Sequence, residues 1–496
     1  MLPSPFSFRC TIPGFQARAG EHGMSDSSPK TPSYDRSLVE GPIGPAVWKL
    51  AWPTMLQNII GGLQGIIDHV MVGHYVGYVG NAAIGVSWQI FLVVIVFIAS
   101  LYTGMAVLVA RFVGANDADK TNRTVYQAFL TSIVLSIGVM APVGYFLAPA
   151  LLSFVNAAPE VTFEALPYLR IMFVFSIGML MFFMLGGALR SAGDARTPLR
   201  LGVLMTLMNI VFNVILIRGL GPIPAFGTKG AAMGTALAAG IVGTIGVSLL
   251  FSGTLVIRLS RAMSWRPDWT IIRSLFRFGL PTGFQGVAMN VAGVLLLRFI
   301  GALDRSAEAQ AAYAIGYTEL FSLIAWTSAG LMGATAAVAG QNLGAGRPER
   351  TVEAVHAAAR IGLMAAAGLG AVFMIGPGFL LGLFGMEDVT VLRLGSQLLR
   401  VLAVSGLFVT VALTYTGGLQ GTGDTRSPLY ISIVSQIVVP LGMCAILQAT
   451  RGLVPMDIWL AILVGHFTRC TLSVIRFRQG KWRHIVVDIE PKGAGA

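Results

Sequence analysis

Asp68 places a carboxylate inside a long apolar segment of the sequence, residues 48–76. Gln64, Gly61 and Gln57 precede it at steps of four, three and four residues. In an α-helix such steps return to one face, so the four residues form a polar stripe. A charged side chain costs about 2.5–3.5 kcal/mol in the middle of a spanning helix. The stripe is therefore expected to face protein or water rather than lipid.

Asp68 predicts a binding site for H+ or Na+. Burial favours the neutral form of a carboxyl group, which lets it hold and release a proton, and acids within spanning segments mark ion pathways. The alternative is a buried aspartate that backbone or amide donors satisfy and that has no part in transport.

Asn209 and Asn213 share a helical face in the apolar run 204–216, and Thr206 lies close to them. Their amide oxygens suit a cation, and the same amides suit hydrogen bonds between neighbouring helices. Both interpretations remain open.

Glu319 lies about ten residues, or roughly 15 Å, into a span of the second half. It is a candidate for binding a cationic substrate or a second proton, and the alternative is a snorkelling or paired carboxylate. Aromatic faces for an organic cation are available on Tyr317 and on Tyr313, Trp326 and Tyr415. Such residues more often pack or lie in the interfacial belt.

The chain contains the same unit twice. Residues 187–199, GALRSAGDARTPL, return as residues 417–429, GGLQGTGDTRSPL, at an offset of 230. Two similar halves of a membrane protein usually surround one central pathway, so the functional site is expected at their interface. Within each repeat, glycine can end one helix and aspartate can cap the next. These two loops are therefore interpreted as structural.

Composition places the chain in a membrane. Hydrophobic residues make up 55% of it, charged residues 11%, and the mean hydropathy is +0.75. That leaves too little polar surface to cover a soluble body of this length. At roughly 20 apolar residues per span, we count about six spans in each half and about twelve in all. The predicted fold is an all-α integral membrane protein with two six-helix lobes related by a pseudo-twofold axis.

The net charge of +12 would suggest nucleic acid in a soluble protein, but the basic residues gather in short loops between spans. These loops lie an even number of helices apart, which places them on one side. The positive-inside rule assigns that side, and both termini, to the cytoplasm. We therefore expect multi-pass insertion in the cytoplasmic (inner) membrane and no nucleic-acid partner.

The predicted organisation has five parts: a disordered cytoplasmic tail at 1–45, an N-terminal lobe at 46–259, a basic linker at 260–273, a C-terminal lobe at 274–478 and a cytoplasmic tail at 479–496. Met24 is an alternative to Met1 as the true start. Cys10, Cys444 and Cys470 have neither metal-ligand nor redox spacing. No disulfide framework and no metal site is expected, except for Na+ bound by Asp68, Asn209 and Asn213.

Motifs for ATP binding and hydrolysis are absent from the sequence. It contains no G-x-x-x-x-G-K-[ST], no H-E-x-x-H and no G-x-S-x-G. We therefore expect no enzyme activity and no cofactor, and energy for transport has to come from an ion gradient.

Several segments together resemble the multidrug and toxic compound extrusion (MATE) transporters, in particular their DinF-like branch. The resemblance covers about residues 45–483. It rests on Trp52-Pro53, on residues 68–73 (DHVMVG), on residues 104–114, on residues 340–346 (GQNLGAG) and on the paired Gly-Asp-x-Arg-x-Pro loops.

This resemblance implies two six-helix lobes, a central cleft that opens alternately to either side, and export of cationic or amphipathic compounds in exchange for H+ or Na+. Asp68 matches the acid of the family's first helix, and Pro53 the proline at which that helix bends. Asn209 matches an asparagine of the fifth helix, and Thr235 is similar to a cation-site threonine of the sixth.

Two departures from the family pattern bear on the coupling ion. Asn213 stands where many prokaryotic members have a second acid, which favours H+ over Na+. An acid found in the seventh helix of another branch has no counterpart, because that neighbourhood contains Gln285, Met289 and Asn290.

The sequence therefore predicts a monomeric multidrug antiporter with a small-molecule substrate. The expected coupling residues are Asp68, Gln64, Asn209, Asn213 and Thr235, and the expected substrate cleft includes Gln57, Gln285, Tyr317 and Glu319. The alternatives are a flippase for a lipid-linked saccharide, an exporter of one specific metabolite and, in a different class, a membrane enzyme or non-transporting receptor. The flippase would require a basic cleft, whereas the two charges assigned to membrane depth, Asp68 and Glu319, are acidic.

Overall fold

The structure, a computed structural model, describes residues 34–489 except 261, 262, 264 and 265, and it omits the side chains of residues 92–99. The first 33 residues of the predicted N-terminal tail, including Met24 and Cys10, lie outside the described residues. So do residues 490–496 of the C-terminal tail.

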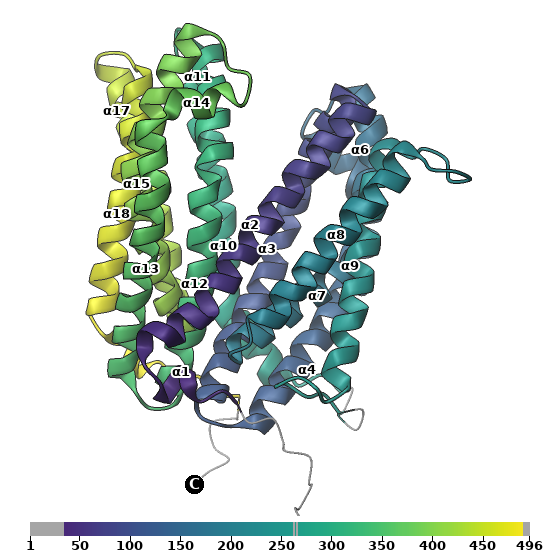
Figure 1. The fold of residues 1–496 in the computed structure, drawn as a ribbon, viewed down its shortest axis with the longest axis vertical. Helices are drawn as coiled ribbons and strands as arrows, with labels where there is room; N and C mark the ends of the chain where they lie inside the picture. Colours follow the sequence, from purple (N-terminus) through teal and green to yellow (C-terminus); the bar gives the residue numbers. More distant parts are fainter. Residues whose placement is uncertain (1–33, 261–262, 264–265, 490–496) are drawn as a thin grey trace, which may run out of the picture. The chain divides into compact units, whose positions relative to one another are not determined.

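The first half consists of a short helix and six longer helical runs (Figure 1). They are α1 (Ser37–Glu40), α2 (Ile43–Tyr75), α3 (Tyr78–Gly114), α4 (Ala118–Leu135) continuing through the π-helical turn η1 (Ser136–Met140) into α5 (Ala141–Phe154), α6 (Pro159–Val174) with α7 (Ser176–Ser191), α8 (Arg196–Arg218) and α9 (Gly227–Phe251).

The second half repeats this plan. It comprises α10 (Trp269–Gly301), α11 (Ser306–Tyr313) continuing through η2 (Ala314–Leu320) into α12 (Ser322–Gly344), α13 (Pro348–Ile375) with the short α14 (Pro377–Gly382), α15 (Val389–Thr422), α16 (Arg426–Ile433) continuing through η3 (Val434–Val438) into α17 (Val439–Thr450), and α18 (Pro455–Arg478) with the 3-10 turn η4 (Lys481–His484).

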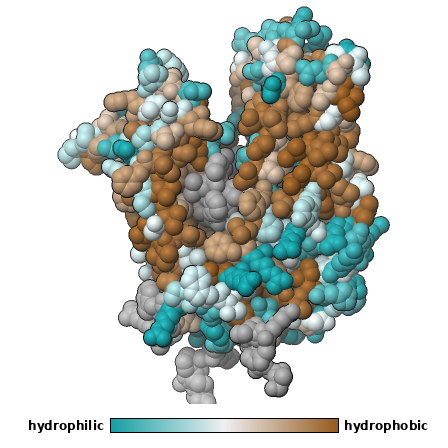
Figure 2. All heavy atoms as spheres, turned by 180° about the vertical axis from the view of Figure 1, so that it is seen from behind, coloured by the Kyte–Doolittle hydropathy of each residue, from teal (hydrophilic) through white to brown (hydrophobic). Residues whose placement is uncertain are grey.

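In the described part of the chain, nine of these runs are long and apolar enough to span a membrane, and the pair α6 and α7, bent by 51°, forms a tenth. Helices α2 and α3 are 33 and 37 residues long. Both are longer than the roughly 20 residues that cross about 30 Å of hydrocarbon. The predicted all-α membrane fold, with six long runs in each half, is confirmed. On the face seen in Figure 2, apolar residues cover most of the coloured surface between the helix ends, and hydrophilic residues gather toward those ends.

The two repeated loops adopt the same turn. Gly193 and Gly423 have φ of 101° and 100°, a left-handed conformation that a Cβ atom disfavours. Asp194 Oδ1 then accepts hydrogen bonds of 3.0 Å from the backbone N–H groups two and three residues later. Asp424 Oδ1 accepts one of 3.2 Å from Ser427 N. Each loop thus ends one helix and caps the next, as the sequence pattern predicts.

Duplicated glycines hold the two halves together where α3 meets α12. A methyl group on Gly114 would clash with the backbone carbonyl of Gln341, and one on Gly344 would clash with that of Arg111. Both glycines and both carbonyls are related by the repeat offset of 230. The contact is therefore reciprocal, with equivalent residues facing each other across the pseudo-twofold axis. The contact lies at the end of α3 that contains Arg111 and at the end of α12 that leads into the loop before α13. We call this end of the molecule the basic end.

Residues 34–45, expected within a disordered tail, are ordered. Leu38 and Val39 of α1 are buried, and the backbone carbonyls of this segment are bound from the second half. Asn342 donates to Leu38 O at 3.1 Å, Arg347 to Val39 O at 2.9 Å, and Arg350 to Gly41 O at 2.7 Å. The prediction was wrong here because two buried apolar side chains and three hydrogen-bond donors, from α12, from α13 and from the residue before α13, hold this polar segment in place.

Candidate functional site

Asp68 of α2 meets Asn213 of α8 inside the first half. The Asn213 amide donates from Nδ2 to Asp68 Oδ1 at 2.6 Å. The same Nδ2 also donates to Asn209 Oδ1 at 3.2 Å, one helical turn away on α8. Asn209 and Asn213 are fully buried. The carboxylate therefore ends a chain of amides rather than standing alone.

This chain continues to a third helix. Asn209 donates from Nδ2 to Thr235 Oγ1 on α9 at 3.0 Å. Asn213 packs directly on Gly234, where a Cβ atom would clash with Asn213 Oδ1. The glycine before Thr235 thus lets α9 approach closely enough for the asparagines to connect α2, α8 and α9.

Three residues of the polar stripe of α2, Gln57, Gln64 and Asp68, contact α8, whereas Gly61 between them is exposed. Thr206 of α8 donates to Gln64 Oε1 at 2.9 Å. Two turns earlier, Gln57 packs beside Gly202, with its buried Oε1 lacking a protein partner in the described residues. The structure therefore brings together the five residues expected to couple the ion, Asp68, Gln64, Asn209, Asn213 and Thr235, with Gln57 farther along the same interface. Pro53 lies inside α2 one turn before Gln57, where it removes one backbone donor.

Tyr168 of α6 is a neighbour of this site that sequence reasoning missed. It is 5% exposed and lies within electrostatic range of Asp68. In the sequence it reads as one more aromatic residue of an apolar helix. The long-range packing of α6 beside α3 and α9, which a local pattern does not reveal, brings it to the acid. His69, next to Asp68 in the chain, instead contacts Asn81 of α3.

The expected cleft residues of the second half do not form one cluster with Asp68. Gln285 is 7% exposed, donates to Ser432 Oγ at 2.8 Å and accepts from Gln420 Nε2 at 3.3 Å. Its amide therefore joins α10 to α16 and α15. Glu319 lies in the π-helical turn η2 and is partly exposed.

Tyr317 belongs to a stack of aromatic rings inside the second half. Its ring stacks on Tyr313 at 5.0 Å and on Phe321 at 5.4 Å between centroids. The stack extends to α18, where Trp459 lies 6.4 Å from Tyr313 and His466 lies 5.7 Å from Phe321. These rings therefore pack the run from α11 to α12 against α18.

Arg469, near the middle of α18, is a third charge at membrane depth beside Asp68 and Glu319. It is 4% exposed, and its Nε has no hydrogen-bond partner among the described residues. Tyr317 and His466 lie within its electrostatic range. The rule that identified Asp68, an ionisable residue in an apolar helix, would have found it. The expectation that the charges at membrane depth are acidic was therefore wrong, because Arg469 is basic and buried within α18.

Neither half contains a group of three or more His, Cys, Asp or Glu side chains within the described residues that would suit a metal ion. Around Asp68 the available oxygens are one carboxylate, two amide oxygens and a hydroxyl. Such a site can hold one proton on the carboxyl, and it offers Na+ a single formal negative charge.

Three comparisons relate this architecture to known proteins. A family model described as MatE matches residues 53–215 and 281–446, one segment in each half. The probable multidrug resistance protein NorM of Thermotoga maritima is 26% identical over 444 residues, which cover 88% of this chain and 92% of that protein. Multidrug resistance protein MdtK of Pectobacterium atrosepticum is 27% identical over 442 residues, covering 86% and 94%.

A solved structure has the same fold. It is described as the outward-facing conformation of a multidrug resistance MATE family transporter of the MOP superfamily. It superposes with a TM-score of 0.83 at 22% sequence identity, over 90% of this chain and 98% of that one.

Proposed function

The chain belongs to the MatE family of membrane transporters, and we propose that it exports cationic or amphipathic organic compounds in exchange for H+. The names of its relatives support a role in multidrug efflux. We place it in the inner membrane with both termini and the basic end in the cytoplasm, acting as a monomer with no cofactor besides the coupling ion. Its assignment to the DinF-like branch stays a prediction.

The hydrogen bond from Asn213 to Asp68 carries this proposal. An ionised Asp68 makes a charge-assisted bond that ties α2 to α8, and through Asn209 and Thr235 to α9. Protonation removes the charge and weakens that bond. Uptake of one proton can therefore change how α2 packs in the first half, and Pro53 supplies a point at which the helix can bend.

Exchange requires that the proton and the substrate favour different states of the cleft. In this structure the halves touch at the basic end through the glycine contacts of α3, whereas the space-filling view shows a hollow between them at the opposite end (Figure 2). With the basic end in the cytoplasm, this arrangement supports a state open to the outside, in which Asp68 takes up a proton and the substrate leaves.

The choice of H+ over Na+ rests on the charges of the site. Na+ is stabilised by several oxygen ligands and by negative charge, and only Asp68 supplies a formal charge among the described residues of this cluster. Asn213 directs an amide N–H rather than an oxygen toward it.

The test is export of a fluorescent organic cation from proteoliposomes, driven by an imposed pH gradient or Na+ gradient. Wild type is expected to respond to the pH gradient and Asp68→Asn to lose that response. Asp304→Asn, a change at an exposed acid in the turn before α11, is the matched control and should behave as wild type. Transport driven by Na+ alone would overturn the choice of ion, and transport that is equal in wild type and Asp68→Asn would overturn the role of Asp68.

A second candidate function, flipping of a lipid-linked saccharide, is favoured by one observation: Nε of Arg469 is buried and has no partner in the part of the chain that the structure describes. A guanidinium at this depth suits a phosphate or pyrophosphate group. Movement of a fluorescent lipid-linked saccharide across the proteoliposome membrane by wild type, and its loss in Arg469→Gln but not in Asp68→Asn, would favour this candidate over drug export.

A further inference from the structure

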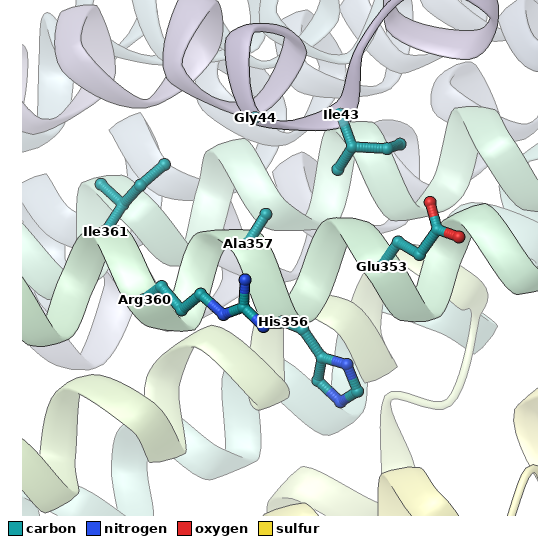
Figure 3. A pocket seen from close by; sticks show the side chains of 7 residues that line it. All are labelled: Ile43, Gly44, Glu353, His356, Ala357, Arg360 and Ile361. Carbon is teal, nitrogen blue, oxygen red and sulfur yellow. The ribbon is translucent and has the colours of Figure 1, made fainter.

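A cavity of about 450 Å³ lies between the start of α2 and the first half of α13 (Figure 3). Ile43 and Gly44 line it from α2, and Glu353, His356, Ala357 and Arg360 line it from α13. It is separate from the Asp68 cluster, which lies between α2, α8 and α9. The mechanism proposed above uses none of its residues.

The α13 wall of this cavity carries one arginine, Arg360, beside His356, and one acid, Glu353. Arg360 and His356 are both exposed, and the charges of Arg360 and of Arg478 from α18 both act on the His356 ring. In Figure 3 the Arg360 side chain runs along α13 toward His356, whereas the Glu353 carboxylate points away from both. One end of the cavity is therefore suited to an anion, and the acid lies at the other.

Arg360 is the last charged residue of α13. Residues 361–386, which run through the rest of α13 and through α14, contain no charged residue and are long enough to cross the hydrocarbon at roughly 20 residues per span. Arg360 thus marks the boundary at which the apolar part of α13 begins.

Apolar side chains flank the same boundary on both helices. Met364, one turn beyond Arg360, is 69% exposed, and Trp48, one turn beyond Gly44, is 51% exposed. A Trp at this position is typical of the membrane interface. The cavity is therefore bordered by residues that suit acyl chains.

We propose that this cavity binds the headgroup phosphate of an anionic phospholipid, such as phosphatidylglycerol, from the leaflet at the basic end. Basic pockets between spanning helices on this side are suited to such headgroups. Arg360 pairs with the phosphate, His356 donates to it, and the acyl chains pass over Met364. Because the cavity joins α2 to the second half, occupancy also biases the position of the helix that carries Asp68, a consequence that rests on the proposed function.

The test is native mass spectrometry of the purified, delipidated full chain titrated with phosphatidylglycerol or phosphatidylcholine. Wild type is expected to retain phosphatidylglycerol in preference. Arg360→Gln should bind it about five-fold more weakly, the factor for about 1 kcal/mol per basic residue. Arg273→Gln, which removes the same charge from an exposed site near the start of α10, should bind as wild type.

Ala357→Leu fills the cavity without changing its charge and should also lower retention. A wild type without preference for phosphatidylglycerol, or equal binding by the Arg360 and Arg273 variants, would overturn the proposal. Inorganic phosphate provides a further test. The proposal would also be overturned if phosphate binding depended on Arg360 as strongly as lipid binding does, and if phosphate at the same concentration as the lipid prevented lipid binding. That result would indicate a site for small anions. The readout needs no transport, so its failure is distinct from failure of the antiporter proposal.

Discussion

Asn213 donates its side-chain amide to Asp68 across the interface of α2 and α8, at 2.6 Å. The two residues are 145 positions apart in the chain. The acceptor is the carboxylate of the polar stripe, and the donor is an uncharged amide. An acid in place of this amide would add a second negative charge to the site. Under the proposed function, the identity of residue 213 is therefore expected to influence which cation is used.

Asn213→Asp is expected to introduce Na+ dependence. A second carboxylate next to Asp68 adds a formal charge and an oxygen ligand, and it removes the amide N–H that now points at the site. Na+-gradient-driven efflux in proteoliposomes should rise from background to a measurable rate. Asn58→Asp provides a control on α2 outside the network, since Asn58 bonds to the backbone of Thr54. No Na+ response in Asn213→Asp would show that charge at 213 does not select the ion.

Gly114→Ala and Gly344→Ala should each weaken the contact between halves at the basic end, because either methyl group clashes with a backbone carbonyl of the other half. Overpacking of this kind costs about 1–3 kcal/mol. The expected result is a lower melting temperature and faster thiol labelling of a cysteine introduced at the basic end. Gly138→Ala is the matched control, since no atom lies within 4 Å of a Cβ at that position. Equal labelling of all three variants would rule out a role of this contact in closing the halves.

Much of this architecture could be predicted because its signals are local. Helical spacing places Gln64 and Asp68 on one face, and the Gly-Asp pattern predicts the turns at Gly193 and Gly423. Partners such as Tyr168 could not be predicted, because they depend on how α6 packs against other helices. Arg469 differs from Tyr168, since an arginine inside an apolar helix is a local signal of the same kind as Asp68. The roles proposed for Asp68 and its neighbours stay predictions.

The docking of α1 should depend on pH through Asp35. Burial raises the pKa of Asp35, but hydrogen bonds from Lys49 and Ser37 outweigh it and hold the pKa below its usual range. Its stabilising contribution is therefore complete above the unfolded value of about 3.9 and is lost as the pH falls through the lower folded value. The protection of the backbone amides of residues 36–41 against hydrogen exchange, measured relative to the intrinsic rate at each pH, should stay high down to about pH 4 and fall below it.

Asp35→Asn should show the faster exchange already at pH 7, because the neutral amide does not form the ion pair with Lys49. Glu40→Gln changes an exposed acid of α1 that pairs with Arg36 and should leave exchange unchanged. If the Asp35 variant exchanged as slowly as wild type at pH 7, the carbonyl contacts from Asn342, Arg347 and Arg350 would be sufficient to hold α1.

Two arginines of α18 are expected to respond in opposite directions to replacement by methionine. Arg469 is buried, and its Nε is unpaired within residues 34–489 as far as the structure describes them. Arg469→Met removes this charge, which is costly to bury, and should raise the melting temperature by the equivalent of about 1–4 kcal/mol. Arg476 pairs with the buried Asp424 at 2.8 Å. Arg476→Met leaves that carboxylate uncompensated and should lower the melting temperature. Thermal unfolding in detergent measures both. A lower melting temperature for Arg469→Met would instead mean that the guanidinium is stabilised where it lies, and would strengthen the case that the second half holds an anion there.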